Sequence, residues 1–263
     1  MRTAGQRSVL ISGASSGIGS AAARMLGHAG YRVKLVGRNT TALAELQEEI
    51  QNDGGMADYM AADLAQDDQR VRVHEWAAQS AEPLSVLINS AGLAWYGYAE
   101  ELPWPVASEM LAVNVEAVTR LTSLALPMMK NRREGHIINI GSIAGSIPSQ
   151  GVALYSATKA FLDAFSTALH RELAGSGVHL SVMRVGAVKT LFFERAARQP
   201  NGKQVPAERF AISPETVARR ILGLIERPRR VVYVPRILRI IPLIELTFGW
   251  IMDRIGPRLL QRD

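Results

Sequence analysis

The sequence predicts an α/β fold, in which a Rossmann-like, doubly wound parallel sheet of seven strands carries helices on both faces of a single domain. Short apolar runs rich in β-forming residues alternate with stretches of helical periodicity, the order expected for parallel strands joined by crossover helices. These runs are hydrophobic almost throughout, as in strands that are covered on both faces. A glycine-rich turn separates the first run from the first helical stretch.

Seven runs are the expected strands: Ser8–Ser12, Arg32–Val36, Met56–Ala61, Leu84–Asn89, His136–Ile140, His179–Arg184 and Val231–Val234. Six segments are the expected helices: Ile18–Ala29, Thr40–Asn52, Asp67–Ser80, Pro105–Lys130, Leu154–Gly175 and Pro214–Glu226. The last helix has a clear start, because Ser213 suits an N-cap and Pro214 suits the first helical position. No linker or repeat interrupts this order, so residues 1–234 are expected to form the domain and residues 235–263 a helical tail that belongs to it.

The composition excludes several classes of protein. Of the 263 residues, 48% are hydrophobic and 21% are charged, which is typical of a folded chain. The chain has no cysteine, so disulfides, thiolate metal sites and a cysteine nucleophile are excluded. The five histidines lack the spacing of metal ligands, and we expect no metal site. No targeting segment is visible before or within the first apolar run, so cytoplasmic residence is expected.

Gly13, Gly17 and Gly19 lie between the first strand and the first helix. Glycine allows a tight turn that approaches a pyrophosphate, whose charge a helix N-terminus favours. The turn therefore predicts a dinucleotide site, and its candidate contacts are Gly13, Ser15, Ser16, Gly17, Ile18 and Gly19. A glycine-rich turn without a ligand is the alternative.

The end of the second strand indicates which dinucleotide is bound. A site that prefers NAD places a carboxylate there for the ribose 2′-hydroxyl. This chain instead has Gly37 and Arg38, and a guanidinium suits a 2′-phosphate. NADP(H) is therefore predicted over NAD(H), with a solvated charge at the strand end as the alternative.

Tyr155 and Lys159 are four residues apart in an expected helix, so they share one face. A neighbouring cation favours the phenolate, and we expect it to lower the pKa of Tyr155. Such a phenol can donate a proton to a ketone, or accept one from an alcohol, near neutral pH.

With Ser142 upstream, these motifs resemble the short-chain dehydrogenase/reductase family over roughly Ser8 to Val234. The resemblance implies that residues 1–234 bind the dinucleotide and carry a catalytic tetrad of Asn114, Ser142, Tyr155 and Lys159. It implies further cofactor contacts at Asp63, Leu64, Asn89, Ala91, Gly92, Tyr155, Lys159, Val188 and Thr190.

The resemblance also implies the chemistry, which is hydride transfer between a nicotinamide and a carbonyl carbon. Tyr155 is then the general acid, and Ser142 holds the substrate oxygen. Lys159 lowers the pKa of Tyr155 and bonds the nicotinamide ribose, while Asn114 holds a water that relays protons between Lys159 and solvent.

Two segments are expected to shape the substrate pocket: Ala94–Tyr98 with Trp104, and Leu191–Phe193 with the stretch onward to Ile212. Their apolar and aromatic side chains favour a hydrophobic ketone, acyl or sterol-like, with core packing as the alternative. A sugar or polyol dehydrogenase with the same tetrad is the second enzymatic hypothesis. A sensor or scaffold that binds NADP(H) without turnover is the alternative from another class.

The net charge of +6 is concentrated in the tail, where Arg227 to Asp263 contain eight arginines and three carboxylates. The rest of the chain is almost neutral, so no nucleic-acid partner is expected. The run from Ile240 to Met252 is shorter than the roughly 20 residues that span a bilayer. Its flanking arginines and Trp250 are typical of a segment lying on an anionic membrane surface, here the inner face.

A helix that closes over the pocket and a subunit contact are the alternatives for this tail. The family resemblance implies a homodimer or homotetramer, formed through the helices predicted at Pro105–Lys130 and Leu154–Gly175.

Overall fold

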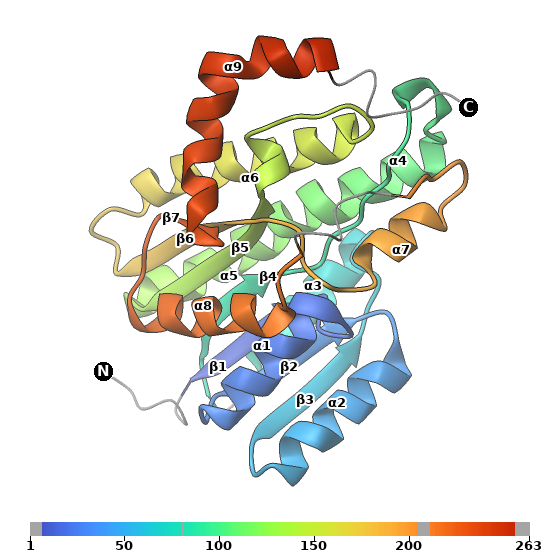
Figure 1. Cartoon of the computed structure of the whole chain (residues 1–263). Helices are drawn as coiled ribbons and strands as arrows, with labels where there is room; N and C mark the ends of the chain where they lie inside the picture. Colours follow the sequence, from blue (N-terminus) through green and yellow to red (C-terminus); the bar gives the residue numbers. More distant parts are fainter. Residues whose placement is uncertain (1–6, 80–81, 205–210, 256–263) are drawn as a thin grey trace.

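Seven strands form one parallel sheet in the order β3-β2-β1-β4-β5-β6-β7 (Figure 1). The computed structural model describes residues 7–79, 82–204 and 211–255. The strands are β1 Ser8–Ser12, β2 Arg32–Gly37, β3 Met56–Ala61, β4 Leu84–Asn89, β5 Gly135–Ser142, β6 Val178–Val185 and β7 Val231–Val234. All seven predicted strands are confirmed, and the doubly wound order reverses between β1 and β4.

Helices cover both faces of the sheet (Figure 1). One layer contains α1 Gly17–His28, α2 Thr40–Asn52 and α8 Pro214–Glu226. The other contains α3 Asp67–Ala78, α5 Val118–Arg132 and α6 Ala153–Glu172. Side chains of β1 alternate between the layers, because Val9 and Ile11 pack into the first and Leu10 into the second. This double burial explains why the strands are apolar throughout.

The helix predicted over Pro105–Lys130 is interrupted. Helix α4 covers Trp104–Leu111, a π-helical turn covers Ala112–Ala117, and α5 follows directly from Val118. A π turn takes an additional residue per turn and is frequent at functional sites. Asn114 lies inside it, completely buried.

Shorter elements complete the described chain. These are the 3₁₀ turns η2 Ala99–Glu101, η4 Ile143–Gly145 and η6 Arg236–Ile240, and the short helix α7 Phe192–Ala197. The sequence patterns did not predict α7. Parts of three expected segments lie outside the described residues: Ser80 of the third helix, residues 205–210 of the pocket stretch and residues 256–263 of the tail.

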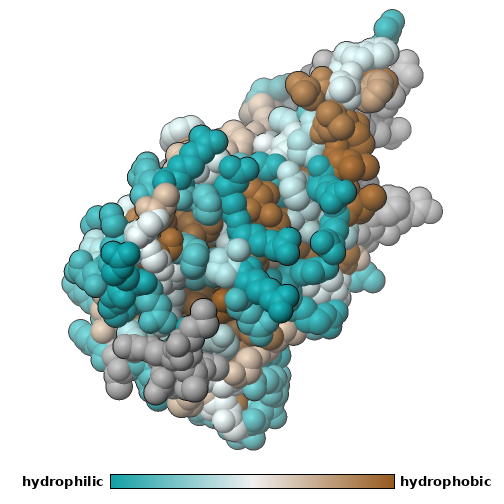
Figure 2. Space-filling view, turned by 90° about the vertical axis from the view of Figure 1, so that its left-hand side faces the viewer, coloured by the Kyte–Doolittle hydropathy of each residue, from teal (hydrophilic) through white to brown (hydrophobic). Residues whose placement is uncertain are grey.

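The tail is helical over α9, Ile241–Ile255, which projects from the body beyond β7 and η6 (Figure 1). Many of its apolar side chains are exposed, including Leu243, Leu246, Phe248 and Trp250. Figure 2 shows this apolar surface along the projecting part of the molecule. Within the described ranges, no helix has the length and hydropathy needed to cross a bilayer.

Candidate active site

Residues of three predicted motifs lie at one edge of the sheet, where three strands end. Ser12 ends β1, Asn89 ends β4 and Ser142 ends β5, and these strands are neighbours. In a parallel sheet, the crevice beyond the carboxyl ends at the point where the strand order reverses is the usual ligand site. The point of reversal here lies between β1 and β4, beside the glycine turn.

The glycine turn is shaped by close backbone contacts. Gly13 and Gly17 have φ of 70° and 59°, a region that L side chains rarely adopt. A side chain at Gly19 would overlap the carbonyl oxygen of Gly13. Ser12 Oγ accepts the N–H groups of Ser90 and Ala91 at 3.0 and 3.1 Å, which fastens this turn to the turn after β4.

The start of α1 fits a phosphate group. The Ser16 side chain makes no capping hydrogen bond to the described first turn, and that turn, from Gly17 to Ser20, has no acidic residue. The Ser20 N–H donates to the Ser16 carbonyl oxygen at 3.3 Å, while the N–H groups before it point toward the start of the helix, where the helix dipole favours an anion. Ser15, Ser16, Gly17 and Ile18 lie around this position, as a pyrophosphate site requires.

The predicted 2′-phosphate position lies at the end of β2. A side chain at Gly37 would lie 3.0 Å from Ser15 Oγ, so this strand end adjoins the glycine turn. Arg38 is exposed, and its Nη1 lies 2.6 Å from Oε1 of Glu109 on α4. The guanidinium is thus held by a carboxylate that could compete with a phosphate.

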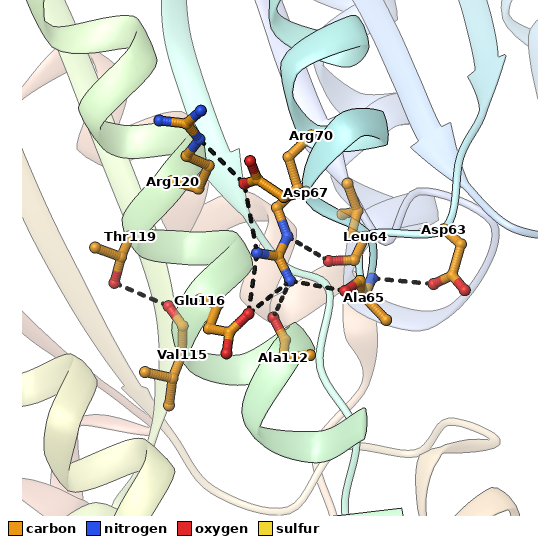
Figure 3. A network of polar contacts seen from close by, with 10 residues as sticks. All are labelled: Asp63, Leu64, Ala65, Asp67, Arg70, Ala112, Val115, Glu116, Thr119 and Arg120. Atoms are coloured by element: carbon orange, nitrogen blue, oxygen red, sulfur yellow. Dashed lines mark hydrogen bonds and ion pairs between the residues drawn. The ribbon is translucent and has the colours of Figure 1, made fainter. Parts of the chain in front are cut away.

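Asp63 and Leu64 form the turn after β3, where the resemblance implies the adenine. The Asp63 carboxylate accepts the N–H of Ala65 at 3.0 Å, and Leu64 is buried. Arg70 on α3, which sequence analysis missed, secures this turn (Figure 3). Its buried guanidinium donates to the carbonyl oxygens of Leu64 and Ala112 at 2.7 and 3.1 Å. Arg70 therefore joins the Asp63–Leu64 turn to the π turn that holds Asn114.

Ser142, Tyr155 and Lys159 meet at the carboxyl end of β5. Tyr155 and Lys159 are on one face of α6, and Lys159 Nζ lies 5.7 Å from the centre of the Tyr155 ring. A hydrogen bond joins the side chains of Ser142 and Tyr155. Lys159 Nζ donates to the carbonyl oxygen of Ile140 at 3.0 Å. The structure thus places close together the three side chains that the sequence predicts to act together.

The direction of the Tyr155 pKa shift was predicted wrongly. Burial raises the pKa of Tyr155 to about 12, and the hydrogen bond with Ser142 offsets this only in part. Burial also lowers the pKa of Lys159 to about 8, against the attraction of Asp163. Removal of water from the phenolate dominates this shift. Tyr155 is therefore a protonated phenol at neutral pH.

Sequence analysis missed a group of three polar residues near Lys159: Asp163, Arg184 and Tyr233. Asp163 follows Lys159 by one turn of α6, and its Oδ1 accepts from Arg184 Nε at 3.0 Å. Arg184 on β6 also donates to the hydroxyl of Tyr233 on β7. Their only sequence signal is that Asp163 lies four residues after Lys159.

Asn114 joins the π turn to α6. Its Nδ2 donates to the Leu93 carbonyl oxygen at 2.9 Å and to Thr158 Oγ1 at 3.0 Å, while its Oδ1 accepts the Leu93 N–H at 2.8 Å. Both Nδ2 hydrogens are used in these bonds. The relay water stays a prediction, and it would have to donate a hydrogen bond to an oxygen atom of Asn114. A side chain at Gly92 would lie 3.5 Å from Asn114 Oδ1 and 3.7 Å from Lys159 Nζ.

The remaining predicted cofactor residues lie at or after the carboxyl ends of β4 and β6. Asn89 uses Nδ2 within the sheet, donating to Asn139 Oδ1 at 2.8 Å, so its side chain fixes β4 to β5. Ala91 lies in the turn held by Ser12. Val188 is buried in a bridge with Ile212, and Thr190 lies against Gly17.

The two predicted pocket segments contact each other. The Trp95 indole donates to the Pro200 carbonyl oxygen at 3.0 Å. Trp95 is buried, so this side chain fits the alternative of core packing. Trp104, in contrast, is 73% exposed. Phe192, at the start of α7, has its ring centre 5.8 Å from that of Tyr155. Aromatic surface therefore reaches the Tyr155 phenol from α7.

Comparisons with known proteins agree with this geometry. The family model described as short chain dehydrogenase matches residues 7–201. An uncharacterized oxidoreductase of Myxococcus xanthus is 33% identical over 184 residues, covering 70% of this chain and 73% of the relative. A very-long-chain 3-oxoacyl-CoA reductase of Laccaria bicolor is 35% identical over 167 residues, covering 62% of this chain and 49% of the relative.

Among solved structures, a short-chain dehydrogenase from Sphingobium yanoikuyae in complex with NADPH is similar throughout. It is 28% identical with a TM-score of 0.81, covering 94% of this chain and 95% of that one. The matched region contains the glycine turn and all four tetrad residues. The chain is an oxidoreductase that belongs to the short-chain dehydrogenase family.

Proposed function

We propose that this protein is an NADPH-dependent reductase that converts the ketone of a hydrophobic, lipid-like substrate into a secondary alcohol, or runs in reverse. The observation that carries the proposal is the meeting of Ser142, Tyr155 and Lys159 at the same edge of the sheet as the glycine turn. NADPH, when bound, supplies the hydride. The protein supplies the proton, the orientation and the electrostatic environment.

Each catalytic side chain has a role that follows from its state. Tyr155 is protonated at neutral pH, so it donates its proton to the carbonyl oxygen as negative charge develops there. Ser142 stabilises the same oxygen by a hydrogen bond. The Lys159 ammonium stabilises the phenolate that the proton leaves behind, and Asn114 holds α6 in register through Thr158.

The cofactor is held in two places. The first turn of α1 and the glycine turn bind the pyrophosphate, because a helix N-terminus favours an anion and this first turn has no acidic residue. Arg38 binds the 2′-phosphate once it leaves Glu109. The NADPH in the Sphingobium yanoikuyae structure supports this choice of cofactor.

The lipid-like substrate is supported by apolar surface near the phenol. Phe192 lies against Tyr155, and Leu191, just before it, is 50% exposed. The Laccaria bicolor relative is named for a long acyl substrate. A hydrophobic ligand gains affinity from burying such side chains.

The first test replaces Tyr155 with Phe. Turnover of any ketone substrate should fall by roughly 10²- to 10⁴-fold because the proton donor is lost. NADPH binding, measured by fluorescence, should be nearly unchanged. Tyr59→Phe on the distant strand β3 is the control and should retain activity. Unchanged turnover in Tyr155→Phe would contradict the mechanism.

The substrate class is tested with NADPH oxidation against ketones of increasing chain length, with and without detergent micelles. A lipid-like substrate predicts rates that rise with chain length and with micelles. Rates confined to short polar carbonyls would instead favour a sugar or polyol dehydrogenase. Tight NADPH binding without turnover of any ketone would favour a sensor or scaffold.

We also propose that α9 lies on an anionic membrane surface, on its inner face. Exposed Leu246 and Trp250 supply the apolar contact, while exposed Arg236 and Arg239 at its base supply positive charge. The full chain should co-sediment with phosphatidylglycerol vesicles at low salt, and less with phosphatidylcholine vesicles. Arg236→Gln/Arg239→Gln should weaken this, whereas the exposed pair Arg219→Gln/Arg220→Gln should not. Absence of wild-type binding to anionic vesicles would refute the proposal.

A homodimer through α5 and α6 is proposed as well. Phe161 on α6 is 38% exposed and stacks on Phe165, with ring centres 5.7 Å apart. Burial of this pair against a second copy would remove apolar surface from water. Phe161→Ser should therefore shift the mass measured by light scattering toward the monomer, and an unchanged mass would argue against this interface.

A further inference from the structure

Helix α7 connects the glycine turn with the catalytic phenol. At one end, the Phe192 ring lies 5.8 Å from the Tyr155 ring, centre to centre. One turn later, Arg195 Nη1 donates to Ser16 Oγ at 3.0 Å. Thr190, just before α7, lies against Gly17. A single short element therefore contacts both the cofactor turn and the proton donor.

Arg195 differs from Arg38 and Arg198 in how its charge is balanced. Arg38 pairs with Glu109 at 2.6 Å, and Arg198, one turn further along, pairs with Glu194 at 3.6 Å. Within the described ranges, no carboxylate pairs with Arg195. Among the described residues its partner is a neutral hydroxyl, so its positive charge is not paired with a carboxylate there.

The surroundings of Arg195 add positive charge. Ser16 is the N-cap of α1, where the helix dipole is positive, and the first turn contains no acidic residue. An anion placed between this exposed guanidinium and the helix N-terminus would be attracted by both. The pyrophosphate of the proposed function is such an anion, and a guanidinium can bond it with a planar pair of N–H groups.

We propose that Arg195 binds the cofactor pyrophosphate and thereby holds α7 over the catalytic phenol. The inference rests on the proposed function and adds a cofactor ligand to it. The pyrophosphate is favoured over the 2′-phosphate because Arg195 contacts Ser16, at the start of α1. The end of β2, with Gly37 and Arg38, instead adjoins Ser15.

Binding of NADPH and NADH, measured by fluorescence without any substrate, tests the assignment. Both cofactors share the pyrophosphate, so Arg195→Gln should weaken both by about the same factor, ten- to a hundredfold. Arg38→Gln should weaken NADPH alone. Arg198→Gln, a loss of charge on the residue just after α7, is the matched control and should change neither.

Chymotrypsin cleavage after Phe192 or Phe193 tests the closing of α7. NADPH should slow cleavage in the wild type and in Arg198→Gln, and this protection should be lost in Arg195→Gln at a cofactor concentration that saturates the variant. Equal protection would show that α7 does not depend on Arg195.

The outcomes separate this inference from the proposed function. If the wild type binds neither cofactor, the proposed function fails. If the wild type binds NADPH and Arg195→Gln binds it equally well, Arg195 is not a ligand. If Arg195→Gln weakens NADPH but leaves NADH unchanged, the pyrophosphate assignment is overturned in favour of the 2′-phosphate.

Discussion

Lys159 Nζ donates to the carbonyl oxygen of Ile140 at 3.0 Å, which fixes the ammonium 5.7 Å from the centre of the Tyr155 ring. The partner is a neutral main-chain acceptor, and the side chain is only 5% exposed. The charge is therefore supported by one hydrogen bond and by the more distant Asp163. This environment makes the protonation state of Lys159 sensitive to pH.

The rate of ketone reduction is predicted to fall as pH rises through about 8, the pKa to which burial lowers Lys159. Below that pH the ammonium is present and stabilises the developing phenolate, and above it the cation is lost. Tyr155 keeps its proton throughout, because its pKa lies at about 12. The measurement is kcat/KM for a ketone between pH 6 and 10. A flat profile through pH 8 would contradict this role of Lys159.

Lys159→Met should raise thermal stability at pH 7 while abolishing most activity. Because burial lowers the Lys159 pKa from 10.5 to about 8, the unfolded chain binds this proton more strongly than the folded chain. Stability from this group therefore rises with pH between about 8 and 10.5 and is lowest below 8. Removing the charge should stabilise the fold by roughly 1–3 kcal/mol at pH 7. Unfolding curves at pH 7 and 10 should show this gain shrinking at the higher pH.

Sequence patterns predicted the sheet well because its strands are buried on both faces. Val9, Leu10 and Ile11 are all apolar for that reason, and the run is visible without any structure. The glycine turn, Tyr155 and Lys159 could be found because local spacing fixes their geometry. The π turn around Asn114 could not, since it depends on Arg70 and Thr158, which come from other segments.

The error in the Tyr155 pKa has a related cause. The spacing of Tyr155 and Lys159 shows that a cation lies near the phenol, but it does not show how much water the fold removes from both. Burial is a property of the assembled sheet and helices. Arg195 was missed for the same reason, because its contact with Ser16 joins residues 179 positions apart.

Asp163→Asn should lower the pKa of Lys159 further, because the carboxylate that favours the ammonium is removed. The fall in reduction rate should then begin at a lower pH than in the wild type. The variant should also be less stable, since Arg184 loses its ionic partner at 3.0 Å. Tyr233→Phe is the control, because it removes the other hydrogen bond of Arg184 and keeps Asp163. If Asp163→Asn loses stability but keeps the pH profile of the wild type, Asp163 has only a structural role.

The 2.6 Å pair between Arg38 and Glu109 predicts that Glu109 limits NADPH affinity. Arg38 is more than half exposed, so this pair is worth only about 0–1 kcal/mol, and Glu109→Gln should tighten NADPH binding by no more than roughly fivefold. NADH binding should not change, because NADH has no 2′-phosphate for the released guanidinium. Arg38→Gln should weaken NADPH by about tenfold or more.

The matched control for Glu109→Gln is Glu48→Gln on α2, which removes the same charge from an exposed position. Titrations of both variants with NADPH and NADH, at low and high salt, separate a local effect from a change in net charge. A gain seen in both variants would reflect net charge alone. Weaker NADPH binding in Glu109→Gln would mean that the carboxylate orients Arg38 toward the phosphate, and the competition inferred from their ion pair would be wrong.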